Sequence, residues 1–269
     1  MRKRKYLLIK MIYIVAFVLM ILTKGYSLEQ IRISVDNKQR DLFLYVPENT
    51  TQEKLPVVIV FHGYGQELTE AISKFRIDKY WPEAIVVYPR GLSTTIQKME
   101  TGGAKSGWQT YVGDYKDRDI RLFDEILSYL KNKYPIDENK IYVTGFSNGA
   151  AFSYVVATVR RNVIAAIAPI AGTLGSIKDR NIFKEIPVFH VAGKQDEIVK
   201  FKSQKEMIEF IKKINKCNDE GIIINKNVTE YKSAIDKPLT TFIYNDIHKI
   251  PGDAIPFIVE FFKNNTLTQ

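Results

Sequence analysis

The chain alternates short apolar runs with longer amphipathic segments over most of its length. Continuous runs of aliphatic and β-branched residues are typical of strands that are covered on both faces of a sheet. Such runs occur at 56–62, 84–88, 140–145, 163–170, 187–193 and 239–244. Two earlier segments, 31–35 and 41–45, alternate apolar and polar positions around Asn37-Lys38. They predict an antiparallel hairpin at a sheet edge.

The segments between these runs carry helical patterns. In 116–134, apolar side chains recur near a 3.6-residue period, and Pro135 ends the pattern. Further helices are predicted at 148–160, 202–214 and 254–263. Because strands alternate with helices, we predict an α/β fold with a mostly parallel central sheet and helices on both faces. Ligands bind such sheets at the carboxyl ends of the strands.

One long stretch, 91–114, shows neither pattern. It is rich in glycine and contains Trp108 and Tyr111. Loops of this length in compact domains are usually functional or disordered, and this one leaves the end of a predicted strand. We therefore expect Trp108 and Tyr111 to line a substrate pocket. The alternative is that both rings pack within the loop.

The strongest chemical signal is the segment Gly145-Phe146-Ser147-Asn148-Gly149. A bare G-x-S-x-G pattern is common, but here it follows a predicted strand and opens a predicted helix. That setting is the nucleophile elbow, a tight turn that presents a serine above a sheet. A plain glycine-rich turn is the alternative. We predict that Ser147 is a nucleophile at a helix N-terminus, where developing negative charge is favoured.

A serine hydroxyl needs a base to take its proton, and the chain has three histidines. His190 lies inside an apolar run, where a core histidine is expected. His62 closes a predicted strand. His248 follows the last predicted strand, on a loop at its carboxyl end, so we predict that His248 is the base.

The imidazole of a catalytic histidine needs an acidic partner. Asp196 lies just beyond a predicted strand, with the adjacent Glu197 as its rival, whereas Asp246 is a local loop acid two residues from His248. The chain order Ser147, Asp196, His248 is that of the α/β-hydrolases. We predict that these three residues form a catalytic triad in an α/β-hydrolase fold.

An oxyanion that develops on the substrate needs backbone donors. One is expected from the amide of Asn148, which follows the nucleophile. The other is expected from the glycine-containing loop 62–65, which comes after an early strand. We assign this second donor to Tyr64, with Gly63 as the alternative.

The first 27 residues are typical of an export signal. Arg2–Lys5 form a basic start, an apolar run covers 11–22, and small residues follow. The run is short for a membrane span, which takes about 20 residues; an uncleaved anchor beginning at Tyr6 is the alternative. We predict a signal peptide over 1–27, a single domain over 28–269, secretion, and no stable membrane association after cleavage.

Charge and cysteine content exclude other classes of function. The net charge is +9, but six of the 39 basic residues and none of the 30 acidic residues lie in the first 27, which leaves +3. That balance does not favour a nucleic-acid partner. Cys217 is the sole cysteine, so no internal disulfide is possible. We find no metal-ligand cluster and no phosphate-binding glycine loop, and therefore predict no metal and no cofactor.

Several segments recur together, in this order, in one group of enzymes. They are Val58–Gly63, Tyr88–Gly91, Gly107-Trp108, Asp119–Phe123, Tyr134–Ala150 and Gly193–Asp196. The chain resembles the feruloyl esterase and poly(3-hydroxybutyrate) depolymerase-like esterases of the first carbohydrate-esterase family. The resemblance implies hydrolysis of esters on plant cell-wall polysaccharide, with Ser147 as nucleophile, Asp196 as acid and His248 as base.

The resemblance implies a feruloylated or acetylated plant polysaccharide or oligosaccharide as the partner, and a feruloyl esterase acting on xylan as the leading function. The alternatives are an acetylxylan esterase, a polyhydroxybutyrate depolymerase, a general short-acyl esterase, or an inactive α/β-hydrolase used as a binding module. The segment Ile247–Gly252 departs from the family pattern around the last histidine, because it lacks a tryptophan. This departure affects the shape of the pocket and hence the choice of substrate.

Overall fold

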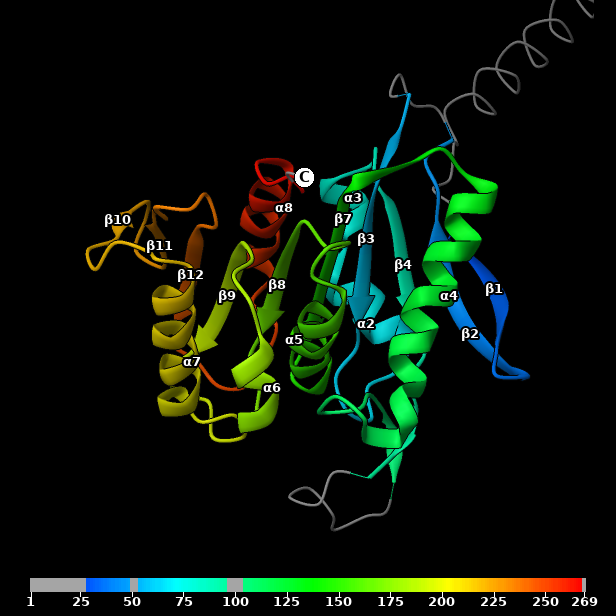
Figure 1. Ribbon diagram of the computed structural model, residues 1–269, viewed down its shortest axis with the longest axis horizontal. Coiled ribbons are helices and arrows are strands. Elements are labelled where there is room, and N and C mark those ends of the chain that lie inside the picture. Colours follow the sequence, from blue (N-terminus) through cyan, green and yellow to red (C-terminus); the bar gives the residue numbers. More distant parts are fainter. Residues whose placement is uncertain (1–27, 49–52, 96–103, 268–269) are drawn as a thin grey trace, which may run out of the picture.

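The computed structural model describes residues 28–48, 53–95 and 104–267 (Figure 1). The strands are β1 (Leu28–Val35), β2 (Lys38–Tyr45), β3 (Leu55–Phe61), β4 (Ile85–Pro89), β5 (Leu92–Thr94), β6 (Lys105–Gly107), β7 (Ile136–Phe146), β8 (Ala166–Ile170), β9 (Val188–Gly193), β10 (Ile222–Ile223), β11 (Val228–Tyr231) and β12 (Leu239–Tyr244). The helices are α2 (Leu68–Phe75), α3 (Ile77–Tyr80), α4 (Arg118–Lys133), α5 (Asn148–Arg160), α6 (Ile177–Ile182), α7 (Phe201–Ile214) and α8 (Ile255–Lys263), with 3-10 turns at Asp114–Asp117 and Gly252–Ala254. The predicted signal peptide lies outside the described residues.

A ten-stranded sheet forms the centre of the fold, in the order β1-β2-β4-β3-β7-β8-β9-β12-β11-β10. The strands from β4 to β12 in this order run parallel to one another. Antiparallel strands complete both edges, with β1 and β2 on one side and β11 and β10 on the other. The prediction of a mostly parallel sheet with an antiparallel hairpin at one edge is confirmed.

Helices cover both faces of this sheet, which explains the continuous apolar runs in its central strands. Every residue of β3, β4, β8 and β9 is buried. On one face, which is turned to the viewer in Figure 1, side chains of α4, α5 and α7 join a large core cluster. On the other face, side chains of α2, α3 and α8 form a second cluster. The predicted helices on both faces are confirmed.

The helical prediction at 116–134 starts two residues too early. The helix α4 begins at Arg118, because Tyr115, Lys116 and Asp117 have positive φ angles that an α-helix excludes. The stretch 91–114 also contains a short antiparallel pair, β5 and β6, which its glycine-rich sequence does not reveal. Within the described residues, none of the helices is both long and apolar enough to cross a membrane.

The topology gathers the predicted site residues at one edge of the sheet. Parallel strands point the same way, so the segments that follow β3, β7, β9 and β12 leave from the same edge. The loop after β3 carries Tyr64, and Ser147 follows β7 directly. Asp196 follows β9, and His248 follows β12.

Candidate active site

Ser147 lies at a sharp turn between β7 and α5, as the elbow motif predicts. Its backbone has φ 56° and ψ −114°, a combination that non-glycine residues rarely adopt. A Cβ atom on Gly149 would lie 2.2 Å from the carbonyl oxygen of Phe61, and one on Gly145 would lie 2.5 Å from Gly149. The two flanking glycines are therefore required by close backbone packing against β3.

Ser147 opens onto a cavity of about 740 Å³, a size typical of sites for small ligands. Its backbone N–H donates to the carbonyl oxygen of Ile170 at 2.8 Å, which ties the elbow to the end of β8. The residue keeps 8% of its surface exposed. The cavity is lined by Thr110, Tyr111, Ser147, Asn148, Ala151, Gly172, Thr173, Gly175, Ser176, Glu197, Ile198 and Val199.

The predicted acid and base are in direct contact, although 52 residues separate them. His248 Nδ1 lies 2.7 Å from Asp196 Oδ2. The other carboxylate oxygen, Oδ1, accepts hydrogen bonds from the amides of Ile198 at 2.9 Å and Val199 at 2.8 Å. The Asp196 side chain is fully buried. This environment satisfies a carboxylate and orients the imidazole through Nδ1.

The two rival acids lie elsewhere. Glu197 is exposed and contributes to the cavity wall. Asp246 forms an ion pair with Lys249, which holds the pKa of the Asp246 carboxyl below its usual range. Of the three candidates, it is Asp196 that contacts His248.

His248 lies next to the elbow, against Phe146, the residue that precedes Ser147. Its ring packs against the ring of Phe146, with centroids 4.7 Å apart. Among the described residues, Ser147 Oγ does not hydrogen-bond to His248. Catalytic hydrogen bonds are often long in unliganded enzymes and tighten when substrate binds. The structure thus joins the acid to the base and places both at the edge of the sheet that carries Ser147.

The oxyanion donors predicted from the sequence differ in the hydrogen bonds that they form in the structure. The Gly63 amide donates to Gln66 Oε1 at 2.9 Å, and Gly63 stays the alternative prediction for the second donor. The Tyr64 hydroxyl donates to the carbonyl oxygen of Thr94 at 2.8 Å, which fixes the loop. The Asn148 amide lies in the first turn of α5, where N–H groups have no acceptor within the helix. Tyr64 and Asn148 stay the predicted donors.

Trp108 does not line the cavity, and this prediction is wrong. Its side chain is fully buried and stacks on Phe152. The indole Nε1 donates to the carbonyl oxygen of His62 at 2.8 Å. The Asn148 side chain bonds to both backbone groups of Trp108, at 2.7 and 3.0 Å. Trp108 therefore connects His62, which directly follows β3, to Asn148 in the elbow.

Tyr111 lies where a substrate-binding ring is expected. It is 49% exposed and lines the cavity that contains Ser147. Its backbone is fixed because Gln109 Nε2 donates to the Tyr111 carbonyl oxygen at 3.0 Å. Contact between Tyr111 and a substrate stays a prediction.

The other two histidines are buried and have structural partners. His62 Nδ1 lies 2.7 Å from the carbonyl oxygen of Gly63, and its Nε2 accepts the Gly91 amide at 2.9 Å. Burial lowers the pKa of His62. His190 Nδ1 lies 2.7 Å from the Tyr154 hydroxyl, and burial lowers the pKa of His190 to about 3.

One residue near the acid was missed in the sequence. Gln204 on α7 is fully buried, and its Nε2 lies 3.1 Å from Asp196 Oδ2. A signal for it exists, because Gln204, Met207, Ile208 and Ile211 share the buried stripe of the helix. A polar residue on such a stripe indicates a buried hydrogen bond. The described residues contain no group of three or more His, Cys, Asp or Glu side chains that could hold a metal ion.

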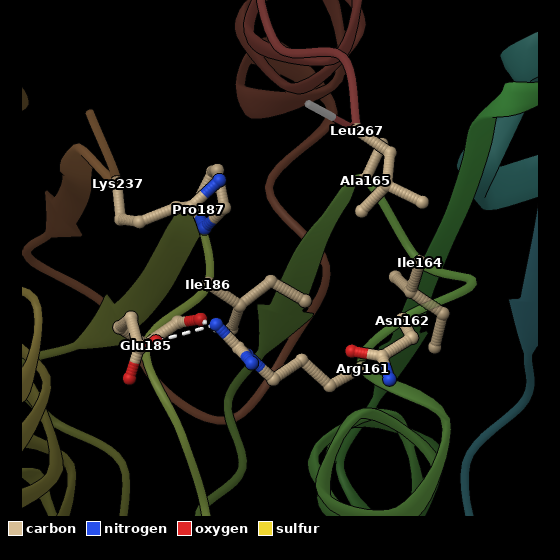
Figure 2. A pocket seen from close by; sticks show the side chains of 9 residues that line it. All are labelled: Arg161, Asn162, Ile164, Ala165, Glu185, Ile186, Pro187, Lys237 and Leu267. Carbon is tan, nitrogen blue, oxygen red and sulfur yellow. Dashed lines mark hydrogen bonds and ion pairs between the residues drawn. The ribbon is translucent and has the colours of Figure 1, made fainter. Parts of the chain in front are cut away.

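A second cavity, of about 300 Å³, lies at the other edge of the sheet (Figure 2). Ile164 and Ala165 precede β8, and Ile186 and Pro187 precede β9, so this cavity is at the amino ends of the strands. An ion pair between Arg161 and Glu185 crosses it. It contains none of the predicted site residues.

The sheet order, the elbow and the acid–base pair together define an α/β-hydrolase. The chain belongs to the phospholipase/carboxylesterase family, whose model matches residues 46–247.

Three known proteins illustrate the likeness. The chain is 28% identical to a bifunctional acetylxylan esterase/xylanase of Neocallimastix patriciarum over 60% of this chain and 22% of that protein. It is 24% identical to feruloyl esterase D of Neurospora crassa over 54% of this chain and 49% of that protein. The solved acetyl xylan esterase from Aspergillus awamori superposes with a TM-score of 0.66 at 15% identity, over 88% of this chain and 99% of that chain.

These proteins confirm the resemblance to feruloyl and acetylxylan esterases. The chain spans about half or less of the length of the two curated relatives. The similarity to the solved structure concerns the fold.

Proposed function

We propose that this protein is an exported serine carboxylic-ester hydrolase that releases ferulate from plant cell-wall xylan. The observation that carries the proposal is the contact between His248 and Asp196 beside a strained serine that opens onto a cavity. That combination is the arrangement required for nucleophilic attack on an acyl group.

The geometry supports a two-step reaction. Ser147 Oγ attacks the ester carbonyl carbon while His248 Nε2 takes the hydroxyl proton. Asp196 holds the protonated imidazole through Nδ1. The amides of Asn148 and Tyr64 donate to the oxyanion. The intermediate collapses to an acyl-Ser147, and the alcohol leaves with the proton from His248. Water then attacks the acyl-enzyme, with His248 as base, to release the acid and restore Ser147.

The choice of a feruloyl substrate rests on the cavity and on the relatives. Tyr111 presents an exposed ring at a cavity large enough for a small aromatic acid. One curated relative is named as a feruloyl esterase. Another is named as a bifunctional acetylxylan esterase/xylanase, which makes acetylated xylan the second candidate substrate. Polyhydroxybutyrate and simple short-acyl esters are further alternatives.

A hydrolysis panel on the purified protein tests the proposal. We expect release of ferulate from methyl ferulate and feruloylated xylan to exceed release of acetate from acetylated xylan. Activity on polyhydroxybutyrate alone would refute this choice of substrate. Ser147→Ala should lower kcat on p-nitrophenyl acetate by about 10⁴-fold or more; unchanged hydrolysis would refute the mechanism.

A fluorophosphonate probe separates an enzyme from an inactive binding module. We expect it to label wild-type protein at Ser147 and to leave Ser147→Ala unlabelled. Absence of labelling in folded wild-type protein would favour the module.

We further propose export through residues 1–27. The expected check is recovery of a processed chain outside the producing cell, with an N-terminus near residue 28.

A further inference from the structure

Gln204 contacts the carboxylate oxygen of Asp196 that also faces His248. Asp196 Oδ1 is bonded by two amides of its own loop, Ile198 and Val199. Asp196 Oδ2 is shared by His248 Nδ1 at 2.7 Å and Gln204 Nε2 at 3.1 Å. Of these donors, Gln204 alone lies on a packed helix, α7, that contacts the central strand β9.

The orientation of the Gln204 amide follows from its neighbours. Its Nε2 faces two acceptors, Asp196 Oδ2 and the carbonyl oxygen of Val199 at 2.6 Å. A flipped amide would place an oxygen against both of them, so the NH₂ group must occupy this position. Both of its hydrogens are then used to fix the acid loop.

The other end of the same amide is unsatisfied. Gln204 is fully buried, and its Oε1 has no hydrogen-bond partner among the described residues. A buried acceptor without a partner is destabilising, and such groups call for an explanation. The remaining buried stripe of α7 includes Met207, Ile208 and Ile211, so an apolar side chain would suit the packing better. The two hydrogen bonds that the Gln204 NH₂ group donates, to Asp196 and Val199, explain why an amide is present at this position.

We propose that Gln204 is a positioning residue that keeps Asp196 Oδ2 directed at His248 Nδ1. With Oδ1 held by the loop and Oδ2 held by α7, the carboxylate cannot turn away from the imidazole. The imidazole in turn stays oriented for proton transfer at Nε2. Because Gln204 does not line the cavity that contains Ser147, its removal should affect the chemical step and leave substrate binding unchanged. The inference rests on the proposed function.

The test compares two buried side-chain amides, one on α7 and one on the residue that directly follows it. Gln204→Met keeps the length of the side chain and removes both donors. Asn215→Leu is the matched control, because Asn215 is fully buried directly after α7. Among the described residues, its side-chain amide bonds only the backbone of Ile186, at 2.7 and 3.3 Å. The measurements are kcat and KM on p-nitrophenyl acetate per active site titrated with fluorophosphonate, together with Tm.

We expect opposite patterns in the two variants. Gln204→Met should lower kcat about tenfold with KM unchanged, and should change Tm little because the unsatisfied oxygen leaves with the donors. Asn215→Leu should lower Tm and leave kcat and KM unchanged. Because kcat is calculated per titrated active site, unfolded protein does not lower its value. If Gln204→Met does not fold, Gln204→Leu is used in its place.

The possible results are distinguishable. Wild-type kcat in Gln204→Met, or a loss of kcat that Asn215→Leu matches, would overturn the positioning role. Loss of hydrolysis in Ser147→Ala would still support the proposed function in that case. Hydrolysis that persists in Ser147→Ala would overturn the proposed function, and with it this inference.

Discussion

Ser147 is held in a backbone conformation that only dense surroundings can maintain. Strained φ/ψ angles of this kind cost about 1–3 kcal/mol and persist where neighbouring structure determines them. Here the determinants are the bond from the Ser147 amide to Ile170 and the approach of α5 to β3. The absence of side chains at Gly145 and Gly149 allows that approach. The conformation of Ser147 therefore depends on backbone contacts rather than on side-chain packing.

The closest of these contacts gives a residue-scale prediction. Gly149→Ala would place Cβ 2.2 Å from the Phe61 carbonyl oxygen, and Phe61 is held in the sheet by its pairing with β7. We expect a loss of about 3 kcal/mol in the free energy of unfolding, measured by urea denaturation. Gly252→Ala is the control, because its Cβ would meet no heavy atom within 4 Å. Equal stability of the two variants would contradict this account of the elbow.

The sequence predicted the placement of Ser147, Asp196 and His248 better than that of the residues around them. Ser147, Asp196 and His248 each follow a strand, and strand ends are visible in the hydrophobic pattern. Whether a loop ring faces substrate or core is decided by contacts with distant segments. Trp108 is buried because Asn148 and His62, far away in the chain, bond it. Local pattern carried no information on that choice.

At the scale of elements, an internal ion pair joins the edge hairpin to the helix that covers it. Arg40 on β2 lies 3.0 Å from Asp119 on α4, and both side chains are almost completely buried. Burial lowers the pKa of Arg40, against the opposing effect of the Asp119 carboxylate. Asp119 also accepts the amide of Gln109 at 3.0 Å. The same carboxylate thus fixes the hairpin, the helix and the segment that leads to the cavity wall.

This junction gives an element-scale prediction. Asp119→Ala leaves the Arg40 charge buried without its partner, so it should lower the free energy of unfolding by about 3–5 kcal/mol. Arg32→Ala removes an ion pair from the same hairpin, to Asp41, in which the two side chains are 67% and 35% exposed. That variant should lose less than about 1 kcal/mol. Urea denaturation measures both, and comparable losses would refute the special role of the buried pair.

Elements with strong periodicity were predictable, and short elements formed by tertiary contacts were not. The helix at Asn148–Arg160 and the strand at Leu239–Tyr244 have the predicted bounds. The pair β5 and β6 has three residues in each strand, too few to show a period. The pair also requires a close tertiary approach, because a Cβ on Gly91 would lie 2.5 Å from the Gly107 carbonyl oxygen.

At the scale of the whole molecule, the parallel sheet brings widely separated parts of the chain to one edge. The same sheet buries His190, whose strand β9 leads to Asp196. In the unfolded chain this imidazole titrates near pH 6.5, but burial lowers its pKa to about 3 in the fold. The folded state therefore stays unprotonated at His190 over a range where the unfolded state binds a proton.

Linkage between proton binding and folding gives the sign of the effect. Because the unfolded state binds more protons between about pH 3 and 6.5, stability present at neutral pH is lost as the pH falls. From pH 7 to pH 5, His190 alone should remove about 2 kcal/mol from the free energy of unfolding. Urea denaturation of wild-type protein at the two pH values measures the total loss.

The variant His190→Gln isolates the contribution of this one residue. Any change in the bond to Tyr154 acts at both pH values and cancels in the difference between them. Burial also lowers the pKa of His62, but that histidine is present in both proteins, so its contribution cancels as well. We expect the loss of stability from pH 7 to pH 5 to be about 2 kcal/mol smaller in the variant. An unchanged loss would show that His190 takes up a proton within the folded core.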